Sequence, residues 1–158
     1  MKATQELMNE HEGILAMLGI LESIKNKVAA GEAFPGSDME RIVEFLVIFV
    51  DKCHHGKEEE FLFPALEAAG IAKEGGPIGV MLHEHEHGRR LIADIKKSMG
   101  GTTPAVPDTK AFQHGVEAYS ALLRQHIAKE NDVLFPMADN ILSSDADNEL
   151  FARFEQLE

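Results

Sequence analysis

Four long segments of the chain repeat apolar residues with the period of an α-helix, and clusters of glycine and proline separate these segments. None of them shows the sustained apolar–polar alternation that is typical of strands. The pattern predicts helices over about residues 4–30, from residue 37 or 38 to about 69, over 78–99, and from 108 or 109 to about 137. A shorter helix is predicted over about 147–156. We therefore expect an all-α fold, an antiparallel up-down-up-down four-helix bundle capped by a short extra C-terminal helix.

The inward stripes of the predicted helices mix apolar residues with histidine and glutamate. The stripe of the second helix consists of Val43, Val47, Val50, His54, Glu58 and Phe61 or Leu62, and that of the fourth consists of Phe112, Val116, Tyr119, Leu123, His126, Glu130, Val133 and Met137. The first and third stripes contribute His11 and His85. Each of the four predicted helices therefore turns one histidine inward.

Two segments of the chain repeat one another. Residues 54–64, His-His-Gly-Lys-Glu-Glu-Glu-Phe-Leu-Phe-Pro, align without a gap with residues 126–136, His-Ile-Ala-Lys-Glu-Asn-Asp-Val-Leu-Phe-Pro. The alignment superposes His54 on His126 and Glu58 on Glu130. Four residues advance a helix by about one turn, so each imidazole and its carboxylate share one face. The repeat predicts two pairs of metal ligands.

The four inward histidines are predicted to meet. His11 lies about 18 residues before the end of its helix, and His54 about 16 residues after the start of the next. His85 and His126 lie about 14 and 18 residues from the connection that they share. In an antiparallel bundle these counts place all four imidazoles within about one turn of the same level. A lone inward histidine is more often a hydrogen-bonded core residue, but four at one level favour a metal centre.

Charge supports the same interpretation. Two buried carboxylates, Glu58 and Glu130, would be costly without compensating cations, and no lysine or arginine is placed on the inward positions to neutralise both of them. Metal ions would neutralise them, and we expect removal of the metal to raise the proton affinity of both carboxylates.

The third helix offers alternatives, because His83 and His87 flank His85 and are themselves one turn apart. The seam that contains Met81 includes His85 and neither of the other two, so we choose His85 and place His83 and His87 at the rim. Residues His55, Glu59 and Glu60 have no inward counterpart in the second repeat, and we expect them on a flank or a solvated face.

The ligand types restrict the metal. Four imidazoles and two carboxylates suit iron, manganese or zinc, and the absence of a thiolate on the stripes argues against copper(I) or an iron–sulfur cluster. If both carboxylates bridge two ions, each ion takes two imidazoles. With an oxo or hydroxo bridge, each ion is then five-coordinate and keeps one position open. We expect two iron ions, with zinc or manganese as alternatives.

Length and composition restrict the number of domains, the binding partners and the compartment that we expect. We interpret the 158 residues as a single domain, residues 1–158, which is large enough for a continuous core. With 15 basic and 27 acidic residues the net charge is −12, and the basic residues are scattered, so we expect binding neither to nucleic acid nor to a membrane. A single cysteine, Cys53, and the lack of an apparent signal peptide or membrane span favour the cytoplasm. The sequence leaves the oligomeric state open.

The pattern His…His-x-x-x-Glu…His…His-x-x-x-Glu, from His11 to Pro136, resembles the hemerythrin-like cation-binding proteins. The resemblance implies a four-helix bundle with a non-haem di-iron centre that binds oxygen or related small ligands. It also implies that the four histidines are terminal ligands and that Glu58 and Glu130 bridge the ions. The oxygen carriers of this family have a fifth histidine where this chain has Met81, and an aspartate five residues after the last histidine where this chain has Glu130 at four.

Two classes of function follow. The first is a non-catalytic protein that binds oxygen or a related small ligand, or senses oxygen, iron or redox state. The second is a di-iron enzyme that acts on peroxide, nitric oxide or ferrous iron. A bundle without metal that serves only as an interaction module is a third and more ordinary interpretation.

Overall fold

The computed structural model describes residues 1–101 and 106–158, and the regular structure of these residues is entirely helical. The elements are α1 (Lys2–Ala29), α2 (Gly36–Phe45), η1 (Leu46–His55), η2 (Glu58–Leu62), α3 (Phe63–Ala68), α4 (Pro77–Ser98), α5 (Thr109–Lys129), η3 (Glu130–Leu134), α6 (Phe135–Ile141) and α7 (Ser144–Leu157). The three η elements are π-helical segments inside two long helical rods. The second rod runs from α2 to α3, and the fourth rod runs from α5 to α6.

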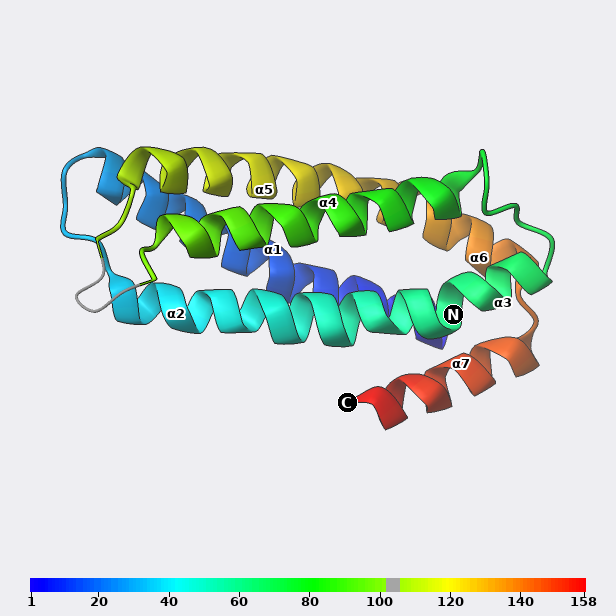
Figure 1. Ribbon diagram of the computed structural model, residues 1–158. Helices are drawn as coiled ribbons and strands as arrows, with labels where there is room; N and C mark the ends of the chain where they lie inside the picture. Colours follow the sequence, from blue (N-terminus) through cyan, green and yellow to red (C-terminus); the bar gives the residue numbers. More distant parts are fainter. Residues whose placement is uncertain (102–105) are drawn as a thin grey trace.

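The four long rods lie side by side with alternating direction, as Figure 1 shows. This arrangement confirms the predicted all-α, antiparallel up-down-up-down bundle. Asp108 caps α5, because its carboxylate accepts a hydrogen bond from the amide of Ala111 at 3.1 Å. The C-terminal helix α7 begins at Ser144, before the predicted start near residue 147. The predicted connection over 100–107 includes residues 102–105, which lie outside the described part of the chain.

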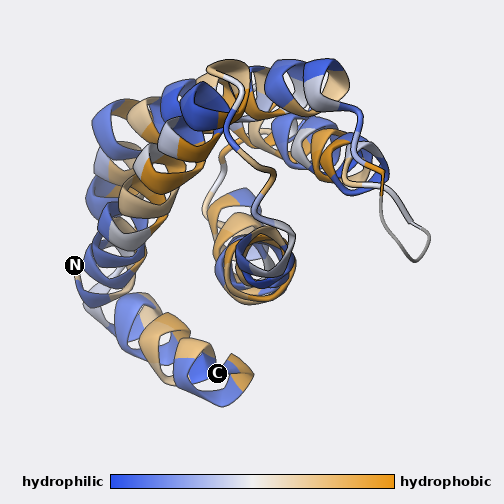
Figure 2. Ribbon diagram, turned by 90° about the vertical axis from the view of Figure 1, so that its left-hand side faces the viewer, coloured by the Kyte–Doolittle hydropathy of each residue, from blue (hydrophilic) through white to orange (hydrophobic). Residues whose placement is uncertain are grey.

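The apolar core has two parts, one on each side of the level where the predicted ligands lie. One cluster contains Ile14, Leu18, Leu46, Val50, Ile92 and Leu123 with their neighbours. The other contains Leu7, Leu62, Phe63, Met81, Leu134 and Phe135 with theirs. Figure 2 shows apolar positions on the sides of the helices that face one another and polar positions outside. Each predicted ligand therefore lies between two apolar layers that keep water away from it.

The π-helical segments change which residues point inward. A π-helix bonds residue i to i+5, so each residue advances less around the axis than in an α-helix. After Glu130 the stripe continues through the buried Leu134 and Ala138, whereas Val133 is 53% exposed and Met137 is also exposed. The prediction that Val133 and Met137 line the stripe is therefore wrong by one residue. The two π segments η2 and η3 both lead into the repeated Leu-Phe-Pro.

The C-terminal helix α7 packs beside the start of α1 and along η2. The carboxylate of Asp147 accepts hydrogen bonds from the amides of Lys2 at 3.0 Å and Ala3 at 2.9 Å. These amides belong to the first turn of α1, where backbone N–H groups have no hydrogen-bond partner within the helix. The extra helix therefore fixes the N-terminal end of the bundle, next to the first predicted ligand.

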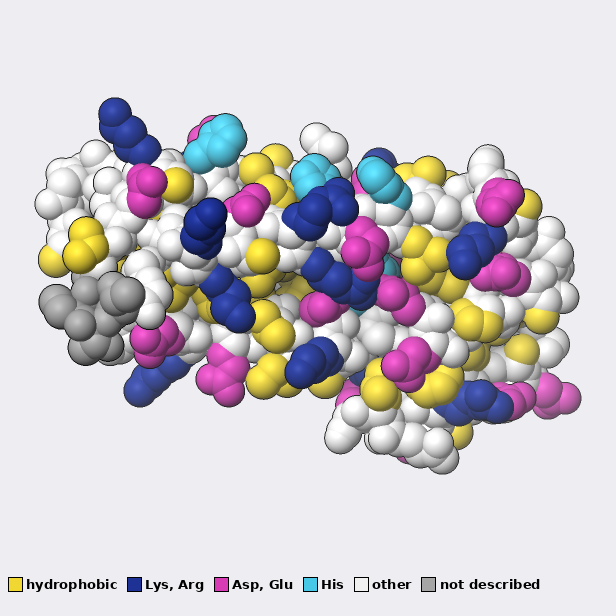
Figure 3. All heavy atoms as spheres, viewed as in Figure 1, with side chains coloured by type: hydrophobic (Ala, Val, Ile, Leu, Met, Phe, Trp, Pro, Cys, Tyr) yellow, Lys and Arg dark blue, Asp and Glu magenta, His cyan; other side chains and the backbone are white. Residues whose placement is uncertain are grey.

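The surface carries charges of both signs (Figure 3). Lys and Arg side chains are interspersed with Asp and Glu across the face drawn in Figure 3. Among the described helices, none combines the length and the apolar character that crossing a membrane requires.

Candidate metal centre

The six predicted ligands come together in the middle of the bundle, and all are buried. His11 lies on α1, His85 on α4 and His126 on α5. The other three lie on π-helical segments, His54 on η1, Glu58 on η2 and Glu130 on η3. Their ligand atoms belong to two groups of four residues, and within each group these atoms lie within 4.8 Å of one another. The groups are His11, His54, Glu58 and Glu130, and His55, Glu58, His85 and His126.

Glu58 belongs to both groups, because its two oxygens face opposite sides of the centre. Oε1 lies 3.3 Å from Nε2 of His54, and Oε2 lies 3.1 Å from Nε2 of His85. Oε1 of Glu130 lies 3.4 Å from Nε2 of His11 and 3.0 Å from Nε2 of His126. Each carboxylate therefore lies between imidazoles of different helices, as a bridge between two ions requires.

The donor atoms that point into the centre fit a metal. The buried atoms there that lack a hydrogen-bond partner are Nε2 of His11, His54 and His55 and both carboxylate oxygens of Glu58 and Glu130. Buried polar atoms without partners are rare, because each carries the cost of its lost hydration. Imidazole nitrogen and carboxylate oxygen are the donors that iron, zinc and manganese take. The centre thus has the chemistry of a site for two metal ions, and the individual ligand roles stay predictions.

All four predicted histidine ligands turn Nε2 inward and hold Nδ1 with a second residue. Nδ1 of His11 is 2.7 Å from Oδ1 of Asn131, and Nδ1 of His85 is 2.8 Å from Oε2 of Glu59. The remaining two such pairs are His54 with Glu10 at 2.9 Å and His126 with Glu84 at 3.0 Å. A hydrogen bond from Nδ1–H to such a partner selects the tautomer whose Nε2 lone pair is free for a metal.

Basic residues hold three of these acidic partners in turn. Lys57 donates to Glu10 at 2.7 Å, and Lys129 donates to Glu84 at 2.7 Å. The two lysines occupy the same position of the repeat, three residues after a histidine ligand. Glu59 accepts a bond from the guanidinium of Arg89. The repeat therefore encodes the orientation of the ligands as well as the ligands.

Sequence reasoning missed some of these residues. His55 is only 4% exposed, so the expectation that it lies on a flank or a solvated face is wrong. Because π-helical residues advance less per step, η1 turns both His54 and His55 inward. Glu59 is half-buried against His85, whereas Glu60 is exposed as expected. The repeat alignment pairs Glu59 with Asn131, and this pairing was the available signal. Each of these residues directly follows Glu58 or Glu130 and orients a histidine of another helix.

The three neighbouring histidines of α4 differ in burial, in the way that the seam containing Met81 predicted. His85 is buried, and His83 and His87 are exposed. Figure 3 shows imidazoles on the surface along the edge formed by α4 and α5.

The electrostatics of the metal-free centre favour protons on the histidines. Burial raises the pKa of Glu58, but His54 and His85 outweigh this effect and hold the pKa well below its usual value. Burial lowers the pKa of His54, but Glu58 and Glu10 raise it to about 9. In the same way Glu130 and Glu84 overcome the burial of His126 and raise its pKa to about 10. Without metal, protons are therefore held on the imidazoles rather than on Glu58.

His55 is the exception among the histidines. Burial lowers its pKa, the neighbouring His85 lowers it further, and the result is a pKa of about 3. Its imidazole is therefore neutral at physiological pH, which is the form that binds metals.

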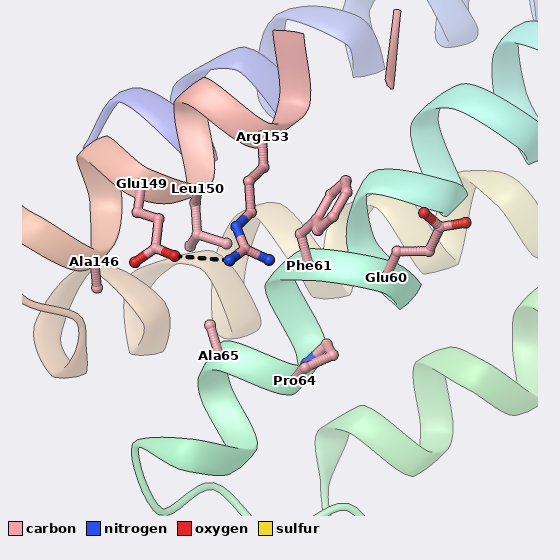
Figure 4. Close-up of a pocket in the computed structure, with 8 residues that line it drawn as sticks. All are labelled: Glu60, Phe61, Pro64, Ala65, Ala146, Glu149, Leu150 and Arg153. Carbon is pink, nitrogen blue, oxygen red and sulfur yellow. Dashed lines mark hydrogen bonds and ion pairs between the residues drawn. The ribbon is translucent and has the colours of Figure 1, made fainter. Parts of the chain in front are cut away.

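A surface pocket of about 270 Å³ lies between η2, α3 and α7 (Figure 4). Arg153 lies over the ring of Phe61 at 5.9 Å and pairs with Glu149 at 2.8 Å. The residues drawn around the pocket include none of the six predicted ligands, so it is separate from the buried centre.

Comparison with known proteins agrees with the geometry. The family model of the hemerythrin HHE cation binding domain matches residues 2–138. The chain is also 38% identical over 88 residues to proteins named iron-sulfur cluster repair protein YtfE from Escherichia coli O1:K1 / APEC and Escherichia fergusonii. That match covers 54% of this chain and 40% of the relatives, so the chain matches less than half of their length. The family match spans most of the chain, and the chain belongs to the hemerythrin HHE cation-binding family.

Proposed function

We propose that this protein is a non-haem di-iron protein that binds oxygen or a related small ligand, or that reports on oxygen, iron or redox state. The observation that carries the proposal is the set of inward donor atoms without partners, three imidazole nitrogens and four carboxylate oxygens, in two groups that share Glu58. Two cations would neutralise the carboxylates and would also bind the lone pairs of these nitrogen and oxygen atoms.

The residues of the chain have distinct parts in such a centre. His11, His54, His85 and His126 would hold the ions as terminal ligands, and Glu58 and Glu130 would bridge them. When bound, iron supplies the redox chemistry and the affinity for oxygen or similar ligands. Glu10, Glu59, Glu84 and Asn131 keep the imidazoles in place. The apolar layers above and below the centre would admit only small molecules to it.

A second candidate is a di-iron enzyme that acts on peroxide, nitric oxide or ferrous iron. The similarity to proteins named for iron-sulfur cluster repair favours it, because that name describes work on protein-bound iron. The two candidates differ in turnover. Sustained consumption of peroxide or nitric oxide at about 10 per second, a typical enzyme rate, would favour the enzyme.

Elemental analysis and optical spectroscopy of aerobically purified protein test the proposal. We expect two iron ions per chain and new absorption bands when the oxidised protein receives azide or the reduced protein receives oxygen. His85→Ala should remove most of the iron, while His83→Ala, a matched change at an exposed histidine of the same helix, should leave it near normal. Protein that contains no iron and takes up none on reconstitution would refute the proposal.

A further inference from the structure

His55 is a buried imidazole that the predicted set of six ligands does not use. It follows His54 directly on η1, and its Nε2 has no hydrogen-bond partner. Its ring lies parallel to that of His85, with centroids 3.8 Å apart and an interplanar angle of 13°. A nitrogen left bare in this way costs free energy, so a histidine that served only for packing would be a poor choice here.

His55 is placed like the predicted ligands, with an acid behind Nδ1, although its contact with that acid is longer than theirs. Nδ1 faces Oδ1 of Asp51, one turn earlier on the same rod, at 3.6 Å. Arg89 holds Asp51 with Nε at 2.8 Å from Oδ1, as Lys57 holds Glu10 behind His54. With an acid behind Nδ1 and a bare Nε2 in front, His55 has both halves of the arrangement that orients a metal-binding imidazole.

His55 also lies close to the other donors of one ligand group. A ligand atom of His55 lies within 4.8 Å of those of Glu58, His85 and His126, which is close enough for one ion to be shared among them. The second repeat cannot supply an equivalent, because Ile127 stands at the matching position. Any contribution from His55 therefore makes the two halves of the centre unequal.

We propose that His55 is a fifth histidine ligand and that it makes the two metal positions chemically different. One position takes His55, His85 and His126, the other takes His11 and His54, and Glu58 and Glu130 lie between the two. The first position therefore has three imidazoles, and the second has two. This inference rests on the proposed function only in requiring that the centre hold two ions.

Anaerobic titration of the metal-free protein with ferrous iron, followed by Mössbauer spectroscopy of the ⁵⁷Fe-loaded protein, tests the inference. Wild type should bind two ions in two spectroscopically distinct environments. His55→Asn keeps a donor toward Asp51 and lacks Nε2. It should weaken one of the two binding steps by at least about tenfold and alter one of the two environments, since even residues behind a ligand change affinity by about 10- to 100-fold.

His83→Ala is the matched control, because it removes an exposed histidine and should leave both steps and both environments unchanged. If His55→Asn binds two ions with wild-type affinities and an unchanged spectrum, His55 is a packed core residue and the inference fails. If wild type itself binds no iron, the proposed function fails as well. The behaviour of wild type therefore distinguishes failure of the proposed function from failure of the inference about His55.

A crystal structure of iron-loaded wild type decides the question without any variant. A distance between Nε2 of His55 and a metal near about 2.1 Å, the usual length of a bond between imidazole and a divalent ion, supports the inference. A distance beyond about 3 Å, well outside that bond length, overturns it.

Discussion

The two repeats of the centre supply the same ligands but surround them differently. Behind His54 lies the chain Glu10–Lys57, and behind His126 lies the chain Glu84–Lys129. Lys57 is fully buried, whereas Lys129 is 46% exposed. The difference comes from α7 and the residue that follows it: the ring of Phe154 on α7 lies 5.7 Å from Nζ of Lys57, and Glu158, directly after the helix, pairs with Lys57.

The repeats differ again at the residues that follow the bridging glutamates. Glu59 places a negative charge behind His85, whereas Asn131 places a neutral amide behind His11. His55 in the first repeat corresponds to Ile127 in the second. The comparison teaches that a duplicated motif repeats the candidate metal ligands, while their differing neighbours make the surroundings of the two repeats unequal.

The largest effect that separates the two repeats should come from the bridging carboxylates. Glu58 belongs to both ligand groups, and Glu130 is grouped only with His11, His54 and Glu58. Glu58→Gln should therefore abolish tight binding of both ions, while Glu130→Gln should retain one. Iron content after loading and desalting measures the difference. Equal loss of iron in the two variants would break the asymmetry that we describe.

The lysines should differ next in their effect on stability. Lys57→Met leaves Glu6, Glu10 and Glu158 without their shared cation, and we expect a loss of roughly 3 kcal/mol in the free energy of unfolding. Lys129→Met removes a half-exposed ion pair and should cost less than about 1 kcal/mol. Denaturant unfolding of the metal-free variants provides the measurement. Similar losses would show that α7 does not distinguish the two positions.

The pH dependence of stability should separate the metal-free from the metal-loaded protein. The pKa values of His54 and His126 rise from 6.5 to about 9 and about 10 on folding, because buried carboxylates face them. Their contribution is fully present below about pH 6.5 and is lost as pH rises toward 9–10.

Thermal melting across this range is the measurement. The metal-free protein should become less stable as pH rises, while the loaded protein, whose imidazoles carry metal in place of protons, should not show this loss. Iron binding should also tighten with rising pH, since fewer protons compete for the ligands. A metal-free protein whose stability does not change from pH 6.5 to 10 would contradict the assignment of the protons to these histidines.

The smallest effect should come from exchanging the residues behind His85 and His11. Asn131→Asp adds a charge behind His11 and should strengthen its hold on ferric iron, and Glu59→Gln should weaken the hold of His85, each by about tenfold. The reduction potential of the loaded protein should fall in the first variant and rise in the second. Shifts of the same sign would show that these residues do not tune the two positions separately.

The sequence predicted much of this centre because the relevant information is local. The helical period, the glycine and proline connections and the His-x-x-x-Glu repeat are properties of neighbouring residues, and they placed His11, His54, His85 and His126 inward at one level. The repeated triplets Glu10-His11-Glu12 and Glu84-His85-Glu86 also contained the two carboxylates that orient His54 and His126. Their role was not predicted, because each acts on a histidine of a different helix.

By itself the sequence determined the all-α bundle and the six residues that could share two metal ions. The tertiary structure decided which further residues reach the centre. The π-helical segments rotate the two repeats so that His55 and Leu134 point inward and Val133 points outward. Packing of α7 buries Lys57, and contacts between helices bring Asn131 to His11 and Glu59 to His85. Such contacts depend on how whole helices rotate and shift against one another, and no local pattern of residues specifies that placement.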